Sequence, residues 1–367
     1  MIIILTPDVS ESGPEVAEVL ALVARFPTVT PKVHGYRGSE HGVVEIHLIG
    51  VDKDVPEAPF RELSSVVQVV RVSEKYRLIG RHSAKLDAIG FDYRGLRFGQ
   101  DTLHLFPGLC AVDTPENVDL TFAAIAKAGI KTARAGAYKP RTSPYDFQGL
   151  GAACLPWVFE LAGKNGIEIV AMEILREKNI DEIAGALAKA GNPCGVFLQI
   201  GTRNAQNFEL LRYAGQQREF PVLYKRGMGI TIEESLNACE YIASEGNRNI
   251  LFCLRGVKSH LGDPHRNLVD FAHVPVVKRL TRLGVCVDPS HSTGRRTAAP
   301  DGLTDIHHAT AQGIIAGANM VLVDFHPSPA TAMCDGPQAL TLDELPAFVR
   351  DCQVVRDCYL SRVQPSP

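Results

Sequence analysis

The stretch Leu103-His104-Leu105-Phe106-Pro107-Gly108-Leu109 begins a regular alternation of short apolar runs and helix-like segments. A segment with helical spacing of apolar residues follows at 115–128, and a second apolar run follows at 131–135. The alternation then continues along the chain. We predict strands at 103–109, 131–135, 168–173, 195–200, 222–225, 249–254, 285–287 and 320–325. We predict helices at 115–128, 155–164, 180–190, 232–244, 307–316 and 342–359.

These strands are continuous runs of leucine and β-branched residues rather than alternations of apolar and polar residues. Such runs are typical of parallel strands that are covered on both faces. Eight alternations of strand and helix indicate an α/β fold, most simply a (β/α)8 TIM barrel over 103–367. An open doubly wound sheet is the alternative. It is disfavoured because no Gly-x-Gly-x-x-Gly or P-loop pattern follows the first strand.

Residues 1–72 follow a different pattern and form a small domain of their own. We expect strands at 2–6, 30–36, 43–49 and 66–72, and helices at 15–25 and 59–63. This order of elements is that of a ferredoxin-like α+β domain. Residues 73–102 contain several glycines and no sustained periodicity, so we interpret them as a connector to the barrel.

The composition excludes several classes of protein. The chain has 367 residues, 45% of them hydrophobic, and a formal net charge of -3, which argues against a general binder of nucleic acid or of membrane surfaces. No apolar stretch approaches the length of a membrane span, and the first residues lack the basic flank of a signal peptide. The nine cysteines are scattered without a Cys-x-x-Cys pair. We therefore expect reduced thiols in a cytoplasmic protein, not disulfides or a structural zinc site.

Polar or charged residues follow every predicted strand of the barrel. In a TIM barrel the carboxyl ends of the strands meet on one face, which carries the reacting groups. Six cationic side chains at these ends suit a substrate with phosphate and carboxylate groups. They are Arg134, Lys139, Arg141, Arg203, Lys225 and Arg255. The alternative is that they pair with structural carboxylates.

The loop 136–144 concentrates hydrogen-bond donors on a short segment that two prolines stiffen. Its donors are Lys139, Arg141, Thr142 and Ser143. A rigid cluster of donors of this kind predicts a site for phosphate or carboxylate groups. A solvated basic turn is the alternative.

A second group of strand-end residues combines sulfur, nitrogen and oxygen donors. It consists of Cys110, His291, Asp324 and Asp335. Mixed ligation fits a catalytic divalent metal ion such as Mn²⁺, Zn²⁺, Co²⁺ or Fe²⁺, with one coordination position open. Taken alone, Cys110 would instead be a small buried apolar residue.

Several short motifs carry a resemblance to a known family. They are Ala135-Gly136-Ala137-Tyr138-Lys139-Pro140-Arg141-Thr142-Ser143-Pro144-Tyr145, Phe147-Gln148-Gly149, Gln199-Ile200-Gly201-Thr202-Arg203-Asn204-Ala205-Gln206-Asn207, Lys225-Arg226-Gly227, Asp288-Pro289-Ser290-His291-Ser292 and Asp335-Gly336. With these motifs the chain resembles the 3-deoxy-7-phosphoheptulonate (DAHP) synthases. The resemblance runs over essentially the whole length and is closest to the form with an N-terminal ferredoxin-like regulatory domain.

The resemblance implies a role for each of these residues. The metal ion, with Mn²⁺ first among the candidates, would be held by Cys110, His291, Asp324 and Asp335. Phosphoenolpyruvate would be bound by Arg134, Lys139, Arg203, Lys225 and Arg255, and the phosphate of erythrose 4-phosphate by Arg141, Thr142 and Ser143. Arg226 and Asp288 belong to the same motifs and would line the substrate site. The catalytic residues would be Lys139, Glu173, Lys225 and His291.

The implied reaction joins phosphoenolpyruvate, erythrose 4-phosphate and water to give 3-deoxy-D-arabino-heptulosonate 7-phosphate and phosphate. It is the first step of the shikimate pathway to the aromatic amino acids. The related octulosonate-phosphate synthases resemble this chain but carry an Asn where Pro140-Arg141-Thr142 stands here. The loop therefore favours the shorter aldose phosphate.

Two positions depart from the family pattern. The first strand runs into Gly108-Leu109-Cys110-Ala111-Val112-Asp113, where the family usually has Gly-Pro-Cys-Ser-Val-Glu. Asp324 stands in place of a glutamate ligand that is one methylene longer, so the metal would move, bind more weakly or recruit His326. Two alternative functions follow from these departures. One is condensation of phosphoenolpyruvate with a different aldehyde, and the other is a non-catalytic sensor of phosphoenolpyruvate.

The resemblance also implies partners. The N-terminal domain would bind an aromatic amino acid as an inhibitor, with His34 near the effector pocket. The chain would form a homo-oligomer, either a tetramer or a dimer. We expect no nucleic-acid partner and no membrane partner.

Overall fold

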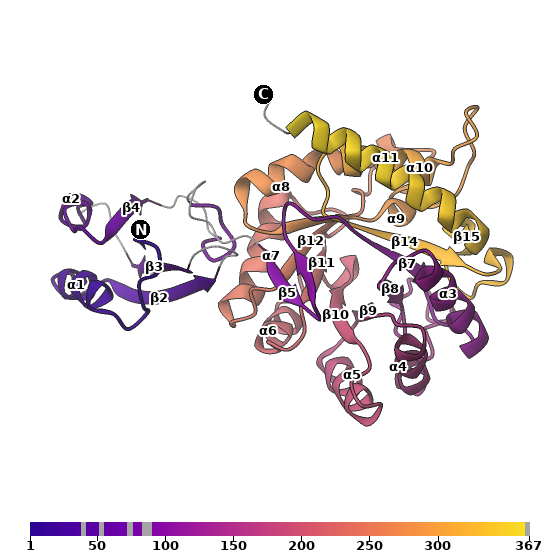
Figure 1. The fold of residues 1–367 in the computed structure, drawn as a ribbon, viewed down its shortest axis with the longest axis horizontal. Coiled ribbons are helices and arrows are strands. Elements are labelled where there is room, and N and C mark those ends of the chain that lie inside the picture. The colour runs from indigo at the N-terminus through magenta and orange to yellow at the C-terminus, as the bar shows by residue number, and fades with distance from the viewer. Residues whose placement is uncertain (38–41, 51–54, 72–75, 83–89, 364–367) are drawn as a thin grey trace. The chain divides into compact units, whose positions relative to one another are not determined.

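The computed structural model describes residues 1–37, 42–50, 55–71, 76–82 and 90–363. The chain forms two compact units, Met1–Gly90 and Phe91–Pro367, whose elements are labelled in Figure 1. The predicted boundary between residues 72 and 73 lies outside the described residues.

Parallel strands close into a barrel in the second unit (Figure 1). Within residues 90–363 the eight barrel strands are β7 (His104–Leu109), β8 (Thr132–Ala135), β9 (Ile169–Ile174), β10 (Gly195–Ile200), β11 (Val222–Lys225), β12 (Ile250–Leu254), β13 (Gly284–Val287) and β14 (Met320–His326). Each strand pairs with the next along the chain, and β14 pairs with both β13 and β7, which closes the cylinder. The predicted (β/α)8 barrel is confirmed, and the open doubly wound sheet is wrong.

Helices cover the outside of the barrel. They are α3 (Pro115–Lys127), α4 (Leu155–Lys164), α5 (Glu177–Lys189), α6 (Phe208–Gln216), α7 (Ile232–Ser244), α8 (Val274–Leu280), α10 (Asp305–Ile315) and α11 (Leu345–Val363). The helices predicted from the sequence do not include α6, although Leu210, Leu211 and Ala214 are buried at helical spacing on it. They do not include α8 because that helix has seven residues and buries only Val274 and Val277, so its periodicity is weak. No helix in the described part of the chain is long and apolar enough to cross a membrane.

A hairpin fills the amino-terminal end of the barrel. Its strands are β5 (Phe91–Tyr93) and β6 (Leu96–Phe98). The hairpin lies within residues 73–102, which the sequence analysis interprets as a connector. The ring of Phe98 is 1% exposed and packs into the barrel core, with its centroid 4.8 Å from that of Phe197. Because this end of the barrel is filled, the carboxyl end is the face that remains for a site.

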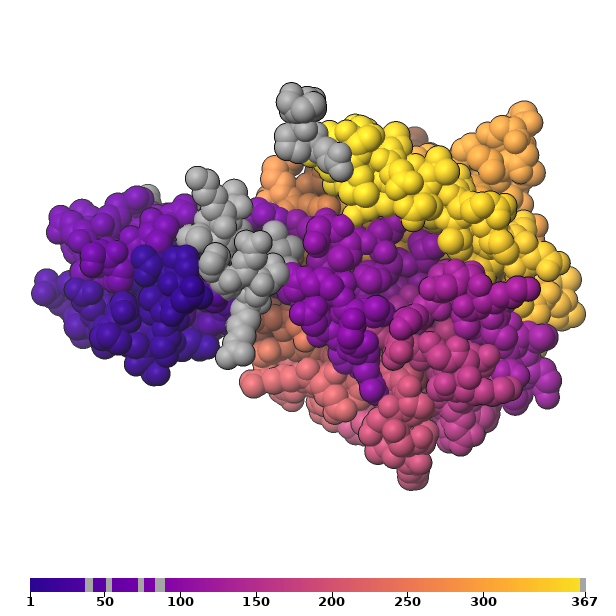
Figure 2. All heavy atoms as spheres, viewed as in Figure 1, coloured from indigo at the N-terminus to yellow at the C-terminus, as the bar shows by residue number. Residues whose placement is uncertain are grey.

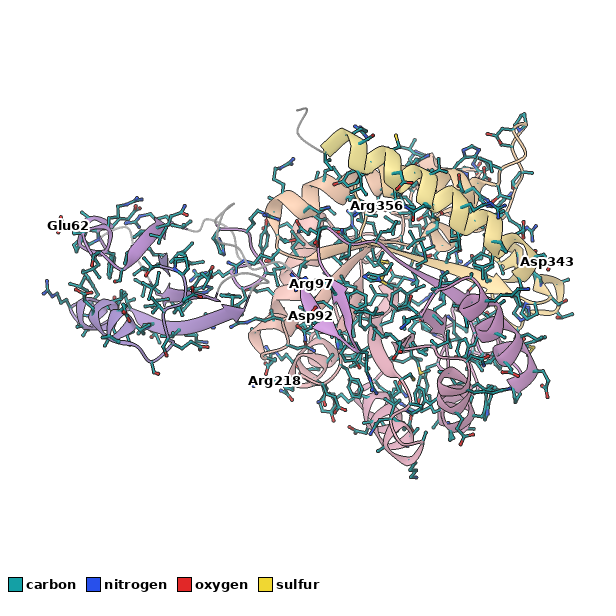
Figure 3. The ribbon with its side chains drawn as sticks, in the orientation of Figure 1. Glu62, Asp92, Arg97, Arg218, Asp343 and Arg356 are labelled. Carbon is teal, nitrogen blue, oxygen red and sulfur yellow. The ribbon has the colours of Figure 1, made fainter. Side chains whose placement is uncertain are left out.

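Charged side chains make contacts within and between outer elements of this unit (Figure 3). Asp92 and Arg97 form an ion pair of 3.7 Å across the hairpin. Arg356 on α11 is buried and donates a hydrogen bond to the carbonyl of Asp101, just before β7. In the space-filling view, atoms of the hairpin segment and of the outer helices form the visible surface of this unit (Figure 2).

The first unit holds, among its described residues, a four-stranded antiparallel sheet and two helices. These are β1 (Ile2–Leu5), α1 (Pro14–Val23), β2 (Thr30–Arg37), β3 (Gly42–Ile49), α2 (Ala58–Arg61) and β4 (Val66–Val70). The sheet order is β2-β3-β1-β4. Its core includes Val19 of α1, Ile46 of β3 and Phe60 of α2. The elements follow the strand–helix–strand–strand–helix–strand order that the sequence predicts.

Replacing the buried ring of the hairpin tests its contribution to the barrel. We expect Phe98→Ala to lower the free energy of unfolding by about 3–5 kcal/mol, because it leaves a cavity where the ring fills the barrel. Urea unfolding of the full chain measures the change. Leu120→Ala on α3 is the control, because Leu120 is 57% exposed and its loss should change stability by less than about 0.5 kcal/mol. Equal effects of the two substitutions would contradict the assignment of Phe98 to the core.

Candidate active site at the carboxyl ends of the barrel strands

Arg134 lies on β8 with its guanidinium inside the barrel, and only 3% of the residue is exposed. It donates a hydrogen bond to the carboxylate of Asp324 on β14, and its Nη2 lies 3.7 Å from Sγ of Cys110. Burial would lower the pKa of Arg134, but the negative charge of Asp324 raises it above its usual value. The structure therefore buries a permanently charged guanidinium with Asp324 as its counter-charge.

The turn after β8 brings Lys139 back over the end of β7. Gly136 permits this turn, because a Cβ there would lie 2.2 Å from the carbonyl oxygen of Cys110. Nζ of Lys139 donates to that carbonyl at 2.9 Å, and it lies 3.2 Å from Sγ of Cys110 and 3.5 Å from Oε2 of Glu173. Burial would lower the pKa of Lys139, but Cys110 and Glu173 raise it, so the ammonium remains charged.

Asp288, at the end of β13, joins a cation to an imidazole. The carboxylate is fully buried and accepts a hydrogen bond from Lys225 at the end of β11. It also begins the short helix α9 (Pro289–Thr293), where Oδ1 accepts from the amide of His291 and lies 3.0 Å from Nδ1 of that ring. Burial would raise the pKa of Asp288, but His291 and Lys225 hold it well below its usual value. A carboxylate can only accept, so Nδ1 carries the proton and Nε2 keeps a free lone pair.

Nε2 of His291 faces a thiol and a carboxylate. Sγ of Cys110 lies 3.6 Å from Nε2 and 3.1 Å from Oδ2 of Asp335, and this oxygen lies 3.8 Å from Nε2. Ligand atoms in a tetrahedral site, at about 2.0–2.3 Å from the metal, are about 3.3–3.8 Å from one another. Two of the three separations lie in this range and the third, at 3.1 Å, is slightly shorter, so the donor atoms are close to the spacing of ligands of one metal ion.

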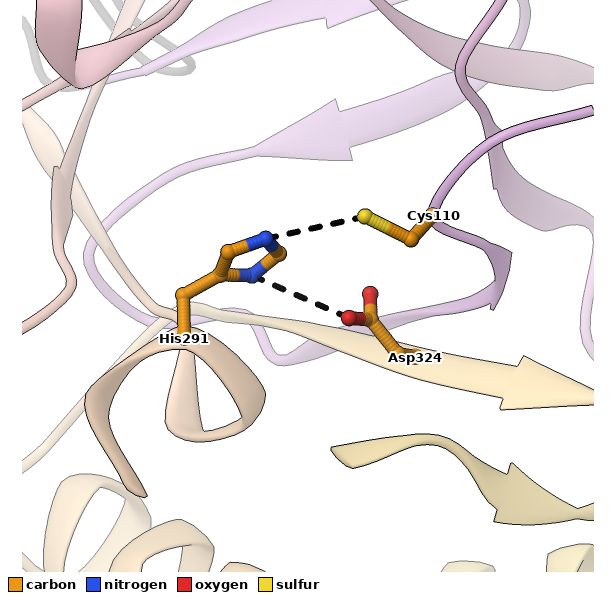
Figure 4. Close-up of side chains that lie close together, drawn as sticks. All are labelled: Cys110, His291 and Asp324. Carbon is orange, nitrogen blue, oxygen red and sulfur yellow. Dashed lines mark hydrogen bonds and ion pairs between the residues drawn. The ribbon is translucent and has the colours of Figure 1, made fainter. Parts of the chain in front are cut away.

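Asp324 faces the other ring nitrogen of the same imidazole (Figure 4). Its Oδ2 is 3.8 Å from Nδ1 of His291, whereas Cys110 lies near Nε2. Donor atoms of Cys110, His291 and Asp324 do lie within 4.8 Å of one another. Both carboxylate oxygens of Asp324 have other partners, however, because Arg134 donates to Oδ1 and Gln338 donates to Oδ2.

Cys334 is a further donor that the sequence does not single out. Its Sγ lies 3.0 Å from Oδ2 of Asp335, and donor atoms of Cys110, Cys334 and Asp335 lie within 4.8 Å of one another. Nη1 of Arg141 donates to Sγ of Cys334 at 2.7 Å. The hydrogen bond between the two sulfurs raises the pKa of Cys110 and lowers that of Cys334. The only signal in the sequence is that Cys334 directly precedes Asp335.

A cavity opens beside this cluster, and most of the predicted cations line it. The lining includes Lys139, Arg141, Thr142, Glu173, Arg203, Lys225, Arg255, His291, Cys334 and Asp335. Nη2 of Arg203 donates to Oγ1 of Thr142 at 3.2 Å, which joins the loop after β10 to the loop after β8. The structure therefore brings the two predicted groups, cations and metal donors, into one site.

Arg255 is the cation in the cavity whose donors are least satisfied. It is 2% exposed, and its Nη2 donates to the carbonyl of His291 at 3.3 Å. Nε and Nη1 have no hydrogen-bond partner among the described residues. Burial lowers the pKa of Arg255 below its usual value. Since an unsatisfied buried guanidinium is costly, the geometry suits an anion that would complete its hydrogen bonds.

Some predicted residues lie outside the cavity lining. Arg226 donates to Asp270 at 2.9 Å and to the carbonyl of Ile230, so it holds the loop after β11. The hydroxyl of Ser143 accepts an amide hydrogen bond within its own loop. Nε2 of His326 lies 2.8 Å from Asp113, and its Nδ1 accepts from a backbone amide. His326 is therefore occupied away from the donor cluster.

Comparison with known proteins identifies the family. The profile of the DAHP synthetase I family matches residues 80–358. The chain belongs to this family. A phospho-2-dehydro-3-deoxyheptonate aldolase from Thermotoga maritima is 36% identical over 357 residues, which cover 97% of this chain and 98% of that protein. The resemblance to the DAHP synthases that the motifs predict is confirmed.

Solved structures agree with this membership of the DAHP synthetase I family. The crystal structure of the T. maritima phospho-2-dehydro-3-deoxyheptonate aldolase (DAHP synthase) has a TM-score of 0.70 and 35% identity, and covers 97% of both chains. A truncated form of the T. maritima synthase has a TM-score of 0.65 and 33% identity, over 77% of this chain and 96% of that one. A 2-dehydro-3-deoxyphosphooctonate aldolase from Haemophilus ducreyi is 34% identical, but only over 32% of this chain and 42% of its own length.

Removing the charge of Asp288 tests how the site is held together. We expect Asp288→Asn to lower the free energy of unfolding by about 3–5 kcal/mol, because Lys225 would be left as an unpaired buried charge. Guanidinium unfolding measures the change. Asp119→Asn is the control, because Asp119 pairs with Lys164 on the surface and its loss should cost less than about 1 kcal/mol. Similar losses in both variants would contradict a buried pair at Asp288.

Proposed function

We propose that this chain is a metal-dependent DAHP synthase, which condenses phosphoenolpyruvate with D-erythrose 4-phosphate and water. The products are 3-deoxy-D-arabino-heptulosonate 7-phosphate and inorganic phosphate, at the entrance to the shikimate pathway. The observation that carries the proposal is the buried cationic cavity beside a cluster of metal donors, in a chain that belongs to the DAHP synthetase I family.

Phosphoenolpyruvate, with its phosphate and carboxylate, is the proposed ligand of the inner cations. Its predicted partners are Arg134, Lys139, Arg203, Lys225 and Arg255. Of these, Arg134 and Lys225 already have carboxylate partners, in Asp324 and Asp288. Arg255 keeps two unsatisfied nitrogens among the described residues, and Lys139 reaches its carboxylate, Glu173, only at 3.5 Å. Arg255 and Lys139 therefore have more to gain from an anionic ligand than Arg134 and Lys225.

The outer loop is the proposed site for the phosphate of erythrose 4-phosphate. Arg141 and Thr142 line the cavity, and Arg141 is shared between Cys334 and the carboxylate of Asp146, 3.3 Å from its Nη2. Ser143 lies next to them in the same loop. A guanidinium with a neighbouring hydroxyl is well suited to a phosphate group.

A divalent metal ion at Cys110, His291 and Asp335 would act as a Lewis acid toward the aldehyde oxygen. Mn²⁺ leads the predicted candidates, followed by Zn²⁺, Co²⁺ and Fe²⁺. The donor set supports this, because a thiol, an imidazole with a free Nε2 and a carboxylate are close to the spacing of ligands. The fourth predicted ligand, Asp324, is held by Arg134.

The protein groups would act mainly by binding and orienting the two anionic substrates. A bond forms between carbon 3 of phosphoenolpyruvate and the aldehyde carbon, water adds at carbon 2, and the bond between carbon 2 and the phosphate oxygen breaks. Lys139 and Lys225 would hold positive charge near the groups that become negative, and Glu173 would help to orient the ammonium of Lys139. Asp288 keeps His291 in one tautomer.

The N-terminal unit is proposed to be a ferredoxin-like regulatory domain over 1–72, joined through 73–102 to the catalytic barrel over 103–367. Its antiparallel sheet with order β2-β3-β1-β4 supports the ferredoxin-like assignment. His34 on β2 lies with its ring centroid 4.6 Å from that of His47. An aromatic amino acid is the proposed inhibitor, and the proposed assembly is a homo-oligomer, tetramer or dimer.

Phosphate release is the direct test of this function. We expect release only when phosphoenolpyruvate and erythrose 4-phosphate are both present, loss of release with a chelator, and recovery when Mn²⁺ or Zn²⁺ is restored. Phenylalanine, tyrosine or tryptophan should slow the same assay. No consumption of either substrate by metal-supplied protein would refute the proposal. If another aldehyde from a panel gave faster phosphate release than erythrose 4-phosphate, that aldehyde would be assigned as the substrate instead.

The unsatisfied guanidinium gives a sharper test of the pocket. We expect Arg255→Ala to lower kcat/KM for phosphoenolpyruvate by about 10- to 150-fold, because a hydrogen bond to a charged group contributes about 1.5–3 kcal/mol. Steady-state kinetics at saturating erythrose 4-phosphate measure the effect. Arg218→Ala, an exposed arginine labelled in Figure 3, is the control and should behave like the unaltered protein. Equal kinetics for the two variants would remove Arg255 from the substrate site.

A further inference from the structure

Cys334 lies against the predicted metal ligands, although none of the family motifs in this chain includes it. Its Sγ is 3.0 Å from Oδ2 of Asp335, and the donor atoms of Cys110, Cys334 and Asp335 lie within 4.8 Å of one another. We propose that the metal site of this chain contains two thiolates, with Cys334 as a ligand in place of Asp324. The inference rests on the proposed function, because the family reaction is the reason to expect a metal ion here.

The two nitrogens of His291 separate the two candidate ligands. Nε2 faces Cys110 at 3.6 Å, on the side of the ring where the thiol cluster lies. Nδ1 faces Asp288 at 3.0 Å and Asp324 at 3.8 Å (Figure 4). A metal ion binds the ring nitrogen that has a free lone pair. Because Nδ1 carries the proton that it donates in a hydrogen bond to Asp288, only Nε2 is free to bind a metal ion. Asp324 therefore faces the ring nitrogen that would not bind the ion.

Asp324 also has a structural role that competes with ligation. It is fully buried, and its two oxygens accept hydrogen bonds from Arg134 and Gln338. Moving the carboxylate to a metal ion would leave Arg134 as an unpaired charge inside the barrel, which is strongly unfavourable. A glutamate would have an additional carbon–carbon bond of about 1.5 Å with which to reach further, and the aspartate does not. The shorter side chain therefore fits a counter-ion.

Cationic groups stand beside both sulfurs. Nη1 of Arg141 lies 2.7 Å from Sγ of Cys334, and Nζ of Lys139 lies 3.2 Å from Sγ of Cys110. These contacts hold both sulfurs beside Oδ2 of Asp335, which lies 3.1 Å from Sγ of Cys110 and 3.0 Å from Sγ of Cys334. Both cations come from the loop after β8, so the loop that is proposed to bind substrate also positions the two sulfurs.

The proposed ligand set is Cys110, Cys334, His291 and Asp335. Two soft thiolates favour Zn²⁺, Fe²⁺ or Co²⁺ over the Mn²⁺ that leads the sequence-based prediction. Catalytic ions of this kind expand to five ligands when a substrate oxygen binds, so four protein ligands leave room for the aldehyde. The site would therefore differ in its metal preference from one with a single thiolate.

Cobalt binding to the reduced, metal-free full chain tests this set, because thiolate-to-Co²⁺ charge transfer absorbs in the near ultraviolet in proportion to the number of bound thiolates. We expect Cys334→Ser to lose roughly half of this absorption, since one of two soft ligands is lost. It should also bind Co²⁺ at least about tenfold more weakly. Losing a residue that only hydrogen-bonds to a metal ligand already weakens metal binding by about 10- to 100-fold, and losing a ligand should cost at least as much. Cys110→Ser should behave similarly, and the exposed Cys358→Ser should match the unaltered protein.

An unchanged cobalt spectrum and affinity in Cys334→Ser would overturn the inference. Asp324→Asn is the second variant, and we expect it to keep the full charge-transfer absorption. If this variant is folded by circular dichroism and loses as much affinity as Cys334→Ser, then Asp324 is a ligand and the inference fails. If it does not fold, Cys334→Ser decides the question alone.

The cobalt measurements need no substrate, so the two proposals can fail separately. Turnover by the unaltered protein together with an unchanged spectrum in Cys334→Ser would overturn the two-thiolate site only. A two-thiolate cobalt spectrum in a protein that releases no phosphate would overturn the proposed function and leave the metal site standing.

Discussion

The pairing of β14 with both β7 and β13 is the constraint on which the whole site depends. Closure brings Asp324 on β14 to Arg134 on β8, although they are 190 positions apart in the chain. It also brings Asp335 to Cys110, across 225 positions. Because the strands are parallel, their carboxyl ends meet on one face, and the hairpin with Phe98 fills the other end. One topological feature therefore assembles both the anion cavity and the donor cluster.

The buried charges of the site divide into two kinds. Arg134 with Asp324 and Lys225 with Asp288 are ion pairs in which each charge has its partner, and they fix the positions of neighbouring side chains. Arg255 has unsatisfied nitrogens among the described residues. A paired charge stabilises the protein without a ligand, whereas an incompletely paired cation gains from binding an anion. The site thus uses the carboxylates of Asp324 and Asp288 for structure and leaves part of its positive charge for substrate.

The fold was largely predictable because strand and helix patterns are local. Continuous apolar runs marked the barrel strands, and helical periodicity marked most of the outer helices. The helix α8 is not predictable in this way because it buries only Val274 and Val277, whereas α6 carries buried leucines at helical spacing that the sequence analysis does not use. The hairpin β5–β6 was also missed, since its strands have three residues each and are stabilised by packing into the barrel rather than by their own pattern.

By itself, the sequence determined which kinds of atoms stand at the strand ends: guanidinium and ammonium groups, thiols, an imidazole and carboxylates. This is possible because strand position in a barrel decides which residues reach the open face. Only the tertiary structure decided which partner each group meets. It placed Asp324 at Nδ1 of His291 and in an ion pair with Arg134, and it added Cys334 beside Asp335. The partner of each side chain depends on the direction in which it points across the closed barrel, and local sequence patterns do not specify that direction.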